Sequence, residues 1–321
     1  MTEKTYYQEI DIVKGIAILL VILGHSFCSH PLNLAEKLPL LGEVVRSFQM
    51  PLFFVASGFL FSTRGGVSTL LRKKAARLIV PYIAFGLLSI CFRHLFSSIT
   101  NGGEVTWGVS LIKMLNGEYY WFLYTLLLIM IIVQLVRKWW ILLCICGLCL
   151  CLSFTDFRSL NFMTLGKVAY FLPFFVLGIH IKSNYSSLLS FYQQHKAITT
   201  YISTILFALS FVKLGEGIGI VITQYICPLL GIIIVWIASK EIADRSWKIR
   251  NVFVHFGHYS LQYYLNHLLI MLPFYILASK ISECHPLIPL LLIFSCAVVT
   301  SFVMLRIELQ TKCTRFLCGL K

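Results

Sequence analysis

The chain alternates between long apolar runs and short polar connections. Ten of these runs are each close to the roughly 20 residues that an α-helix needs to cross a bilayer. This pattern predicts an all-α, polytopic integral membrane protein with about ten transmembrane helices. The runs cover residues 11–28, 45–62, 78–97, 119–136, 139–155, 162–181, 197–213, 217–239, 257–279 and 287–305.

The composition supports a membrane protein and excludes a soluble one. Hydrophobic residues make up 58% of the 321 positions and charged residues only 12%. No stretch is both long and polar, so we expect one membrane-embedded domain over residues 1–321. The formal charge of +14 is then explained by basic cytoplasmic loops rather than by a nucleic-acid-binding surface.

The distribution of Lys and Arg predicts how the chain is oriented in the membrane. With the N-terminus in the cytoplasm, cytoplasmic segments hold 19 of the 27 basic residues and outer segments hold the other 8. Such an excess is typical of the cytoplasmic side of membrane proteins. We therefore expect both termini to be cytoplasmic, in a multi-pass protein of the bacterial cytoplasmic (inner) membrane.

The first apolar run carries three ionisable residues, Asp11, Lys14 and His25. Lys14 and His25 are eleven residues apart, close to three helical turns, so they share one face about 16 Å apart. Asp11 lies one turn before Lys14 on nearly the same face. Ionisable groups in a bilayer normally face a protein interior or a wet cavity. Asp11 and Lys14 also suit a membrane-end anchor, whereas His25 is too deep for one and is either functional or a satisfied buried histidine.

A basic segment follows the second apolar run. Residues 64–78 contain five cations and no acid. One interpretation is topology together with contact to anionic lipid. The other is a phosphate-binding patch, because helical residues three or four apart project to one side. The cations are Arg64, Arg72, Lys73, Lys74 and Arg77.

Polar residues interrupt the apolar runs at three further places. In the stretch from Gln49 to Gly58, Ser57 and Gly58 lie within an apolar run, where small residues usually indicate close helix packing. Glu118 and Trp121 lie at a predicted outer interface, where an aromatic belt is the default explanation and the lining of a cavity mouth is the alternative. Tyr263, Asn266 and His267 lie within the run 257–279. Asn266 and His267 suit either hydrogen bonding between helices or a functional site. The eleven cysteines show no zinc-ligand spacing, so we expect no metal site.

Taken in order, these motifs resemble the acyltransferase 3 family of integral membrane O-acyltransferases, nearest the branch that contains fucose 4-O-acetylase-like proteins. Lys14 and His25 match the family's Arg/Lys-x10-His signature, and Lys74 and Arg77 match its Arg-x-x-Arg element. Lys at the first position of that element does not offer the bidentate phosphate contact of Arg. The matching stretches are Asp11-Ile-Val-Lys-Gly15, Gly24-His25-Ser26, Pro51-Leu-Phe-Phe-Val-Ala-Ser-Gly-Phe59, Arg77-Leu-Ile-Val-Pro-Tyr82, Trp121-Phe-Leu123, Leu172-Pro-Phe-Phe-Val-Leu-Gly178, Gly257-His-Tyr-Ser-Leu261 and Tyr264-Leu-Asn-His267.

The resemblance implies ten membrane helices and a role for each of these motifs. His25 is implied as the catalytic histidine and Lys14 as its paired basic residue. We expect Asp11 to help shape the donor entrance, and Asn266 and His267 to orient the acceptor or the thioester carbonyl. The residues expected to bind the phosphates of CoA are Arg72, Lys73, Lys74 and Arg77, and those expected to bind the acceptor are Glu118, Trp121 and Tyr263.

The predicted activity is transfer of an acetyl or other short acyl group from cytoplasmic acyl-CoA to a hydroxyl of a cell-surface glycan or its precursor. An alcohol needs a positioned base near neutral pH, and histidine suits that role. His25 either deprotonates the acceptor directly or first accepts the acyl group as a covalent carrier. The expected partners are acetyl-CoA as donor, a glycan or sugar acceptor and the bilayer, with no metal cofactor and no nucleic acid.

Two other functions fit some of the same features. A carrier or flippase for glycans or lipid-linked intermediates also needs many spans and buried polar groups. Against it, the ten runs show no obvious repeated halves of the kind that many transporters carry. A non-catalytic assembly or sensor protein requires that His25 tolerate replacement. The basic segment has a use in an acyl-CoA enzyme, which favours the acyltransferase.

Overall fold

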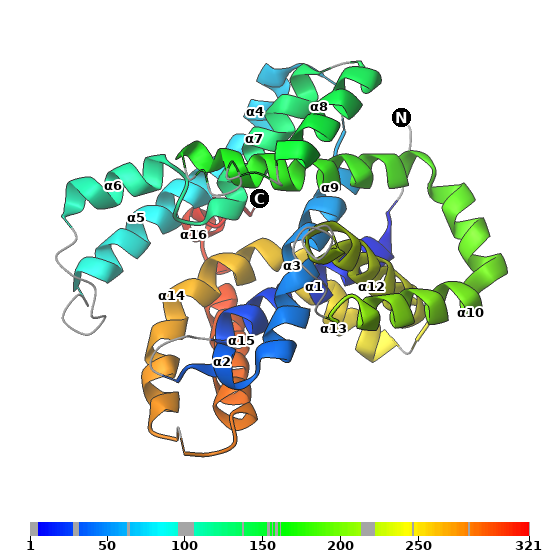
Figure 1. Cartoon of the computed structure of the whole chain (residues 1–321). Helices are drawn as coiled ribbons and strands as arrows, with labels where there is room; N and C mark the ends of the chain where they lie inside the picture. The colour runs from blue at the N-terminus through cyan, green and yellow to red at the C-terminus, as the bar shows by residue number, and fades with distance from the viewer. Residues whose placement is uncertain are drawn as a thin grey trace. The chain divides into compact units, whose positions relative to one another are not determined.

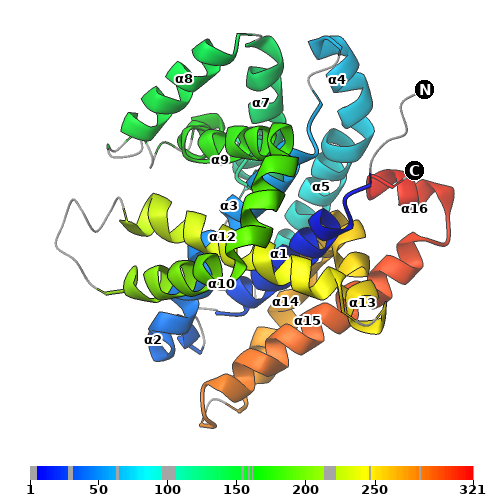
Figure 2. The same cartoon turned by 90° about the vertical axis from the view of Figure 1, so that its right-hand side faces the viewer.

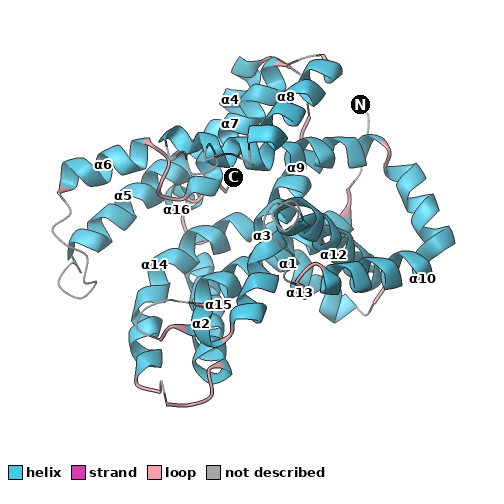
Figure 3. Cartoon of the chain, in the orientation of Figure 1, coloured by secondary structure: helices cyan, strands magenta, loops and turns pink. Residues whose placement is uncertain are grey.

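The computed structural model describes residues 6–27, 32–62, 65–95, 106–136, 138–152, 155, 157, 160, 162–212, 222–245, 247–281 and 283–320. These residues form helices joined by turns and short loops, with no strand in the described part of the chain (Figure 3). The prediction of an all-α fold is confirmed. The helices gather in two compact units, each described by itself.

The first unit comprises Met1–Leu60 and Leu177–Phe302. Helices α9 (Leu165–Ser183) and α15 (Leu287–Glu308) each belong partly to the first unit and partly to the second. The helices that lie wholly in the first unit are α1 (Gln8–Ser26), α2 (Leu34–Lys37), α3 (Pro39–Phe59), α10 (Tyr185–Leu209), the π-helical turn η4 (Ile222–Ile226), α12 (Cys227–Ala243), α13 (Trp247–His258) and α14 (Ser260–Ser279).

The second unit comprises Phe61–Val176 and Val303–Lys321. Helical structure runs without a break from Val67 to Leu95, with a π-helical turn in the middle. The helices of this unit are α4 (Val67–Lys74), the π-helical turn η1 (Ala75–Ile79), α5 (Val80–Leu95), α6 (Trp107–Leu115), α7 (Trp121–Leu135), α8 (Trp139–Leu152), the 3₁₀ turn η3 (Phe162–Thr164) and α16 (Lys312–Leu317).

The described part of each of the ten predicted runs falls mainly on helical structure, while residues 28, 96–97, 153–154, 213 and 217–221 of these runs lie outside the described residues. In the described residues, at least four helices are long and apolar enough to cross a membrane, and α14 adds a fifth if its two parts form one span. Those parts meet at 51°, and Pro273 accounts for the bend because proline removes a backbone donor and clashes with the preceding turn. The count of ten spans and the orientation of the termini stay predictions. The four helices are Ala76–Leu95, Phe162–Ser183, Ile222–Ala243 and Leu287–Glu308.

Helix α1 packs against α3, α12, α13 and α14 in the first unit, as Figures 1 and 2 show from two sides. Its closest crossing is with α13, through two glycines. A Cβ on Gly15 would lie 2.1 Å from the carbonyl oxygen of Phe253, and one on Gly257 would lie 1.7 Å from that of Asp11. Small residues let two membrane helices approach backbone to backbone. The crossing fixes the height of α1 against α13, and with it the position of His25 in this unit.

Small residues also bring α3 close to its neighbours in the first unit. A Cβ on Gly231 of α12 would lie 2.5 Å from the ring of Phe48, and one on Gly178 of α9 would lie 2.1 Å from the carbonyl oxygen of Val55. In a bilayer, helix association depends on close packing and hydrogen bonds, because lipid tails are as apolar as the side chains. The contacts of α1 and α3 therefore form the frame on which the polar residues are placed.

Candidate active site

His25 stands in the last turn of α1, a helix whose buried residues are otherwise apolar or small. Its Nδ1 lies 2.9 Å from the backbone oxygen of Val21, one turn earlier. A carbonyl oxygen only accepts, so the proton of the neutral ring is assigned to Nδ1 and the lone pair to Nε2. The ring is half-buried. His25 thus presents Nε2 as a base or nucleophile in one orientation.

His267 of α14 lies beside His25. The ring centroids are 5.1 Å apart and the ring planes meet at 67°. Its Nδ1 lies 2.9 Å from the backbone oxygen of Tyr263, one turn earlier, so its lone pair is also on Nε2. That Nε2 is buried and has no hydrogen-bond partner among the described residues. The structure thus brings together the two histidines that the sequence predicted for the site.

Asn266 precedes His267 on α14 and is only 1% exposed. Within the described residues, neither its Nδ2 nor its Oδ1 has a hydrogen-bond partner. Most buried polar atoms in proteins are paired, and a buried amide with two unpaired atoms is a candidate for binding a ligand. Asn266 can both donate and accept a hydrogen bond in the first half of α14, next to His267 in the chain.

Two tyrosines connect α14 to its neighbours. The hydroxyl of Tyr275 donates to the backbone oxygen of His25 at 2.7 Å, which satisfies one of the free carbonyls at the end of α1. Tyr263, predicted at the acceptor, is fully buried, and its hydroxyl lies 3.2 Å from Nε2 of His255 on α13. This contact connects α14 to α13, and a role of Tyr263 toward substrate stays a prediction. Sequence reasoning missed Tyr275, because nothing in its spacing marks it.

Asp11 and Lys14 form an ion pair near the start of α1. The Nζ of Lys14 lies 3.0 Å from Oδ1 of Asp11, with the two side chains 21% and 14% exposed. The hydroxyl of Tyr6 donates to Oδ2 of Asp11 at 2.9 Å. Partial burial, together with this hydrogen bond, raises the pKa of Tyr6 to about 12, so Tyr6 stays a donor at neutral pH. The predicted shared face of Asp11 and Lys14 is confirmed, and it lies at the opposite end of α1 from His25.

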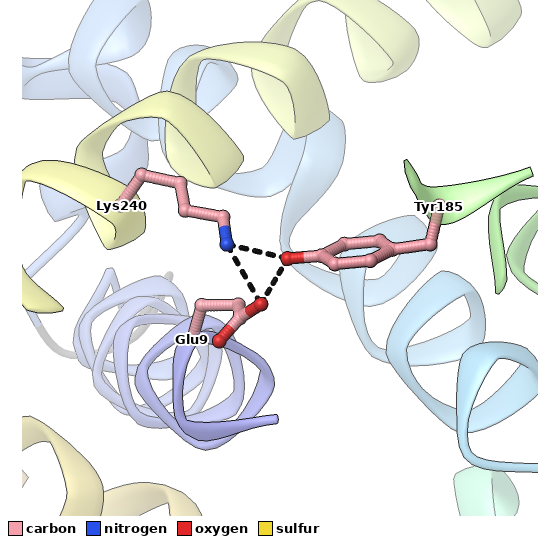
Figure 4. A network of polar contacts seen from close by, with 3 residues as sticks. All are labelled: Glu9, Tyr185 and Lys240. Carbon is pink, nitrogen blue, oxygen red and sulfur yellow. Dashed lines mark hydrogen bonds and ion pairs between the residues drawn. The ribbon is translucent and has the colours of Figure 1, made fainter. Parts of the chain in front are cut away.

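A second polar cluster joins the start of α1 to α10 and α12 (Figure 4). The Nζ of Lys240 lies 2.7 Å from Oε1 of Glu9, the hydroxyl of Tyr185 donates to the same oxygen, and Lys240 also donates to Tyr185. The ring of Tyr185 packs edge-on against Tyr7 and Phe59. Sequence reasoning missed this cluster, since its members lie 55 to 231 positions apart and only the fold joins them.

The basic segment lies in the second unit and is not α-helical throughout. Helix α4 ends at Lys74, and the π-helical turn η1 begins at the next residue. A π-helix bonds residue i to i+5, so the predicted α-helical spacing between Lys74 and Arg77 does not carry over unchanged. Arg72 and Arg77 are exposed and Lys74 is half-buried, while Arg64 and the side chain of Lys73 lie outside the described residues. Single π-helical turns within α-helices are frequent at functional sites.

Glu118 and Trp121 lie at the start of α7, also in the second unit. Glu118 is exposed and Trp121 is half-buried. The ring of Trp121 stacks on Phe171 with centroids 5.5 Å apart, and the Nζ of Lys167 lies 5.7 Å from the Trp121 ring centroid. A cation above an aromatic ring is attracted to it, so Lys167 helps to hold this ring. Contact of Glu118 and Trp121 with an acceptor stays a prediction.

Within the described ranges, no group of three or more His, Cys, Asp or Glu side chains is placed to hold a metal ion. The cysteines described there are all free thiols. The polar groups described above include histidine, amide and tyrosine side chains and an ion pair.

The fold and this site define a class: helical proteins with helices able to cross a membrane and with one half-buried and one fully buried histidine side by side. The model of one family, described as an acyltransferase domain, matches residues 7–306, nearly the whole chain. The chain belongs to this family, acyltransferase 3, as the sequence motifs predicted. Its placement in the fucose 4-O-acetylase-like branch stays a prediction. No curated protein and no solved structure matches the chain significantly.

Proposed function

We propose that this membrane acyltransferase moves an acetyl or other short acyl group from cytoplasmic acyl-CoA to a hydroxyl of a cell-surface glycan or its precursor. Family membership supports acyl transfer as the reaction class. The observation that carries the role of His25 is its hydrogen bond from Nδ1 to Val21, which reserves Nε2 for chemistry. A half-buried base with one orientation is what activation of an alcohol requires.

In the direct route, Nε2 of His25 takes the proton of the acceptor hydroxyl as its oxygen attacks the thioester carbonyl carbon. The tetrahedral intermediate collapses as the C–S bond breaks, and the leaving thiolate takes the proton from the imidazolium. In the two-step route, Nε2 attacks the thioester carbonyl carbon, and the C–S bond breaks to release the CoA thiolate and leave an acyl-imidazole. The acceptor oxygen then attacks the acyl carbon, the C–N bond breaks to restore the ring, and the hydroxyl proton passes to the thiolate. Both routes use the same lone pair, so replacement of His25 stops either one.

The donor is bound through its phosphates in this proposal. Arg72, Lys74 and Arg77 supply positive charge on a segment whose described residues include no acid, and Lys73 belongs to the same segment. Guanidinium groups pair with phosphate oxygens in a two-pronged geometry, whereas Lys acts as a point charge. At the start of α1, Asp11 and Lys14 shape the donor entrance. Glu118, Trp121 and Tyr263 are the residues proposed to contact the acceptor.

The proposal is tested by acyl transfer from labelled acetyl-CoA in membranes that contain wild type or His25→Ala at matched expression. We expect wild type to release free CoA and to label surface glycan, and His25→Ala to lose both by 100-fold or more, because a general base or nucleophile is removed. The matched control is His258→Ala, an exposed histidine at the end of α13, which should keep wild-type activity. Equal activity of His25→Ala and wild type would remove His25 from the mechanism.

A further inference from the structure

Gln49 is a buried amide in an apolar stretch of α3. It is 7% exposed, and its Oε1 has no hydrogen-bond partner among the described residues. The surrounding run, Phe48-Gln49-Met50-Pro51-Leu52, supplies no other side-chain hydrogen-bonding group. A buried polar atom without a partner weakens a fold, so its presence needs an explanation other than stability. A ligand that supplies the missing hydrogen bond is one such explanation.

The position of Gln49 links it to His25. A Cβ on Gly24 would lie 2.5 Å from Oε1 of Gln49 and 2.9 Å from its Nε2. The carboxamide therefore occupies the space beside the residue that precedes His25. One turn earlier on α3, Arg46 also faces this end of α1, with its guanidinium carbon 5.9 Å from the ring centroid of Phe27. One face of α3 thus runs along the last turn of α1.

Two helices that contact α1 each carry an amide with a buried atom that has no partner among the described residues, Gln49 on α3 and Asn266 on α14. On α14, His267 lies beside His25, and its neighbour Asn266 has a carboxamide with no partner in the described part of the chain. On α3, Gln49 lies against the turn that carries His25. A half-turn of a carboxamide exchanges its oxygen and nitrogen, so the N–H of Gln49 can take the place assigned to its unpaired Oε1, and Asn266 offers an N–H in either orientation. Amides supply these donors without the desolvation penalty of a charged group.

We propose that Gln49 is a catalytic residue of the acyl transfer, whose carboxamide N–H binds the acyl carbonyl oxygen while the group is transferred at His25. This role rests on the proposed function. When the hydroxyl oxygen bonds to the carbonyl carbon, the π electrons of the C=O bond move to the carbonyl oxygen. They return as the C–S bond breaks and the thiolate takes the proton held by His25. An N–H aimed at this oxygen stabilises the intermediate more than the ground state.

The test compares Gln49→Met with wild type for both thermal stability and transfer from labelled acetyl-CoA. Met has a similar length and no polar atom, so it fills the space and removes the unpaired amide. We expect an unchanged or higher Tm together with a loss of about 100-fold in kcat, as for one donor of an oxyanion-binding site. KM should change little, because the contact is strongest in the transition state.

The matched control is Gln134→Met on α7. Gln134 is also 7% exposed, but its amide donates to the backbone oxygen of Gly65. We expect this variant to show the opposite result, a lower Tm with a kcat per folded molecule within about threefold of wild type. The comparison of Gln49→Met with Gln134→Met thus separates an effect on kcat from an effect on Tm at two glutamines that are equally buried.

Three outcomes would contradict the role of Gln49, and they are distinguishable. If wild type transfers label and Gln49→Met transfers it at the same rate, Gln49 has no part in the reaction although the proposed function stands. If wild type consumes no acetyl-CoA with any glycan fraction, the proposed function fails and the role of Gln49 fails with it. A Gln49→Met variant with reduced Tm and a kcat that falls only with the folded fraction would make Gln49 a packing residue.

Discussion

At the scale of single residues, the two histidines share one arrangement. His25 and His267 each bond a carbonyl one turn earlier through Nδ1, so each keeps its lone pair on Nε2. Two neighbouring lone pairs do not hydrogen-bond each other, and together they favour a ligand that brings a proton. An acceptor hydroxyl is such a ligand. Both Nδ1 bonds also fix the ring orientation, which lowers the reorganisation needed during transfer.

Arg77 provides a residue-scale prediction about the donor. We expect Arg77→Gln to raise KM for acetyl-CoA about three- to tenfold, since an exposed guanidinium–phosphate contact is lost. The measurement compares acetyl-CoA with S-acetyl-pantetheine, a thioester that lacks the phosphates. KM for S-acetyl-pantetheine should not change. The control Arg93→Gln removes an exposed arginine from the other end of α5. An equal rise with both thioesters would exclude phosphate binding by Arg77.

The sequence revealed only part of the site, and the physical reason lies in the residue types. His25 and His267 were predictable because ionisable groups are rare in apolar runs and need a reason to be there. Gln49 and Tyr275 are uncharged, and such residues in membrane helices usually make ordinary interhelical hydrogen bonds. Only the structure shows that Gln49 lies against Gly24 without a partner and that Tyr275 reaches the carbonyl of His25.

At the scale of secondary-structure elements, apolar runs predicted where the long helices lie. They did not predict α13, a helix with polar residues among its apolar ones, although it makes the closest crossing with α1 at Gly257. They also did not predict the π-helical turn η1. A π-helix differs from an α-helix in its hydrogen-bond pattern, and the mean hydropathy of a run does not depend on that pattern. Hydropathy therefore predicts the long apolar helices. It does not predict a helix such as α13, which is placed by a close backbone contact, or a local change of helix type such as η1.

The cluster of Glu9, Tyr185 and Lys240 gives an element-scale prediction. Lys240→Met leaves the carboxylate of Glu9, 13% exposed, without its cation, and we expect a loss of about 3 kcal/mol in unfolding free energy. The double variant Glu9→Gln with Lys240→Met should recover most of this loss, because no buried charge remains unpaired. Thermal unfolding in detergent measures both variants. Additive losses in the double variant would show that the ion pair does not join α1 to α12.

At the scale of the whole molecule, one family match covers nearly the whole chain, whereas the contacts divide the chain into two units. The match runs from residue 7 to 306, and within this range the chain passes from one unit to the other after Leu60, Val176 and Phe302. The paired histidines belong to the first unit and the basic segment to the second. The donor contact proposed for the basic segment and the transfer proposed at His25 are therefore tested by separate variants, Arg77→Gln and His25→Ala.

The predicted orientation of the molecule is testable with two native cysteines. Cys284 and Cys313 are both exposed, and one membrane-competent helix, Leu287–Glu308, lies between them. With both termini cytoplasmic, Cys284 faces outward and Cys313 faces the cytoplasm. In variants that keep only one of these cysteines, a membrane-impermeant thiol reagent added to intact cells should label Cys284 and spare Cys313. After permeabilisation, both should react. Labelling of Cys313 alone in intact cells would reverse the orientation, and labelling of both would show that Leu287–Glu308 does not separate them across the membrane.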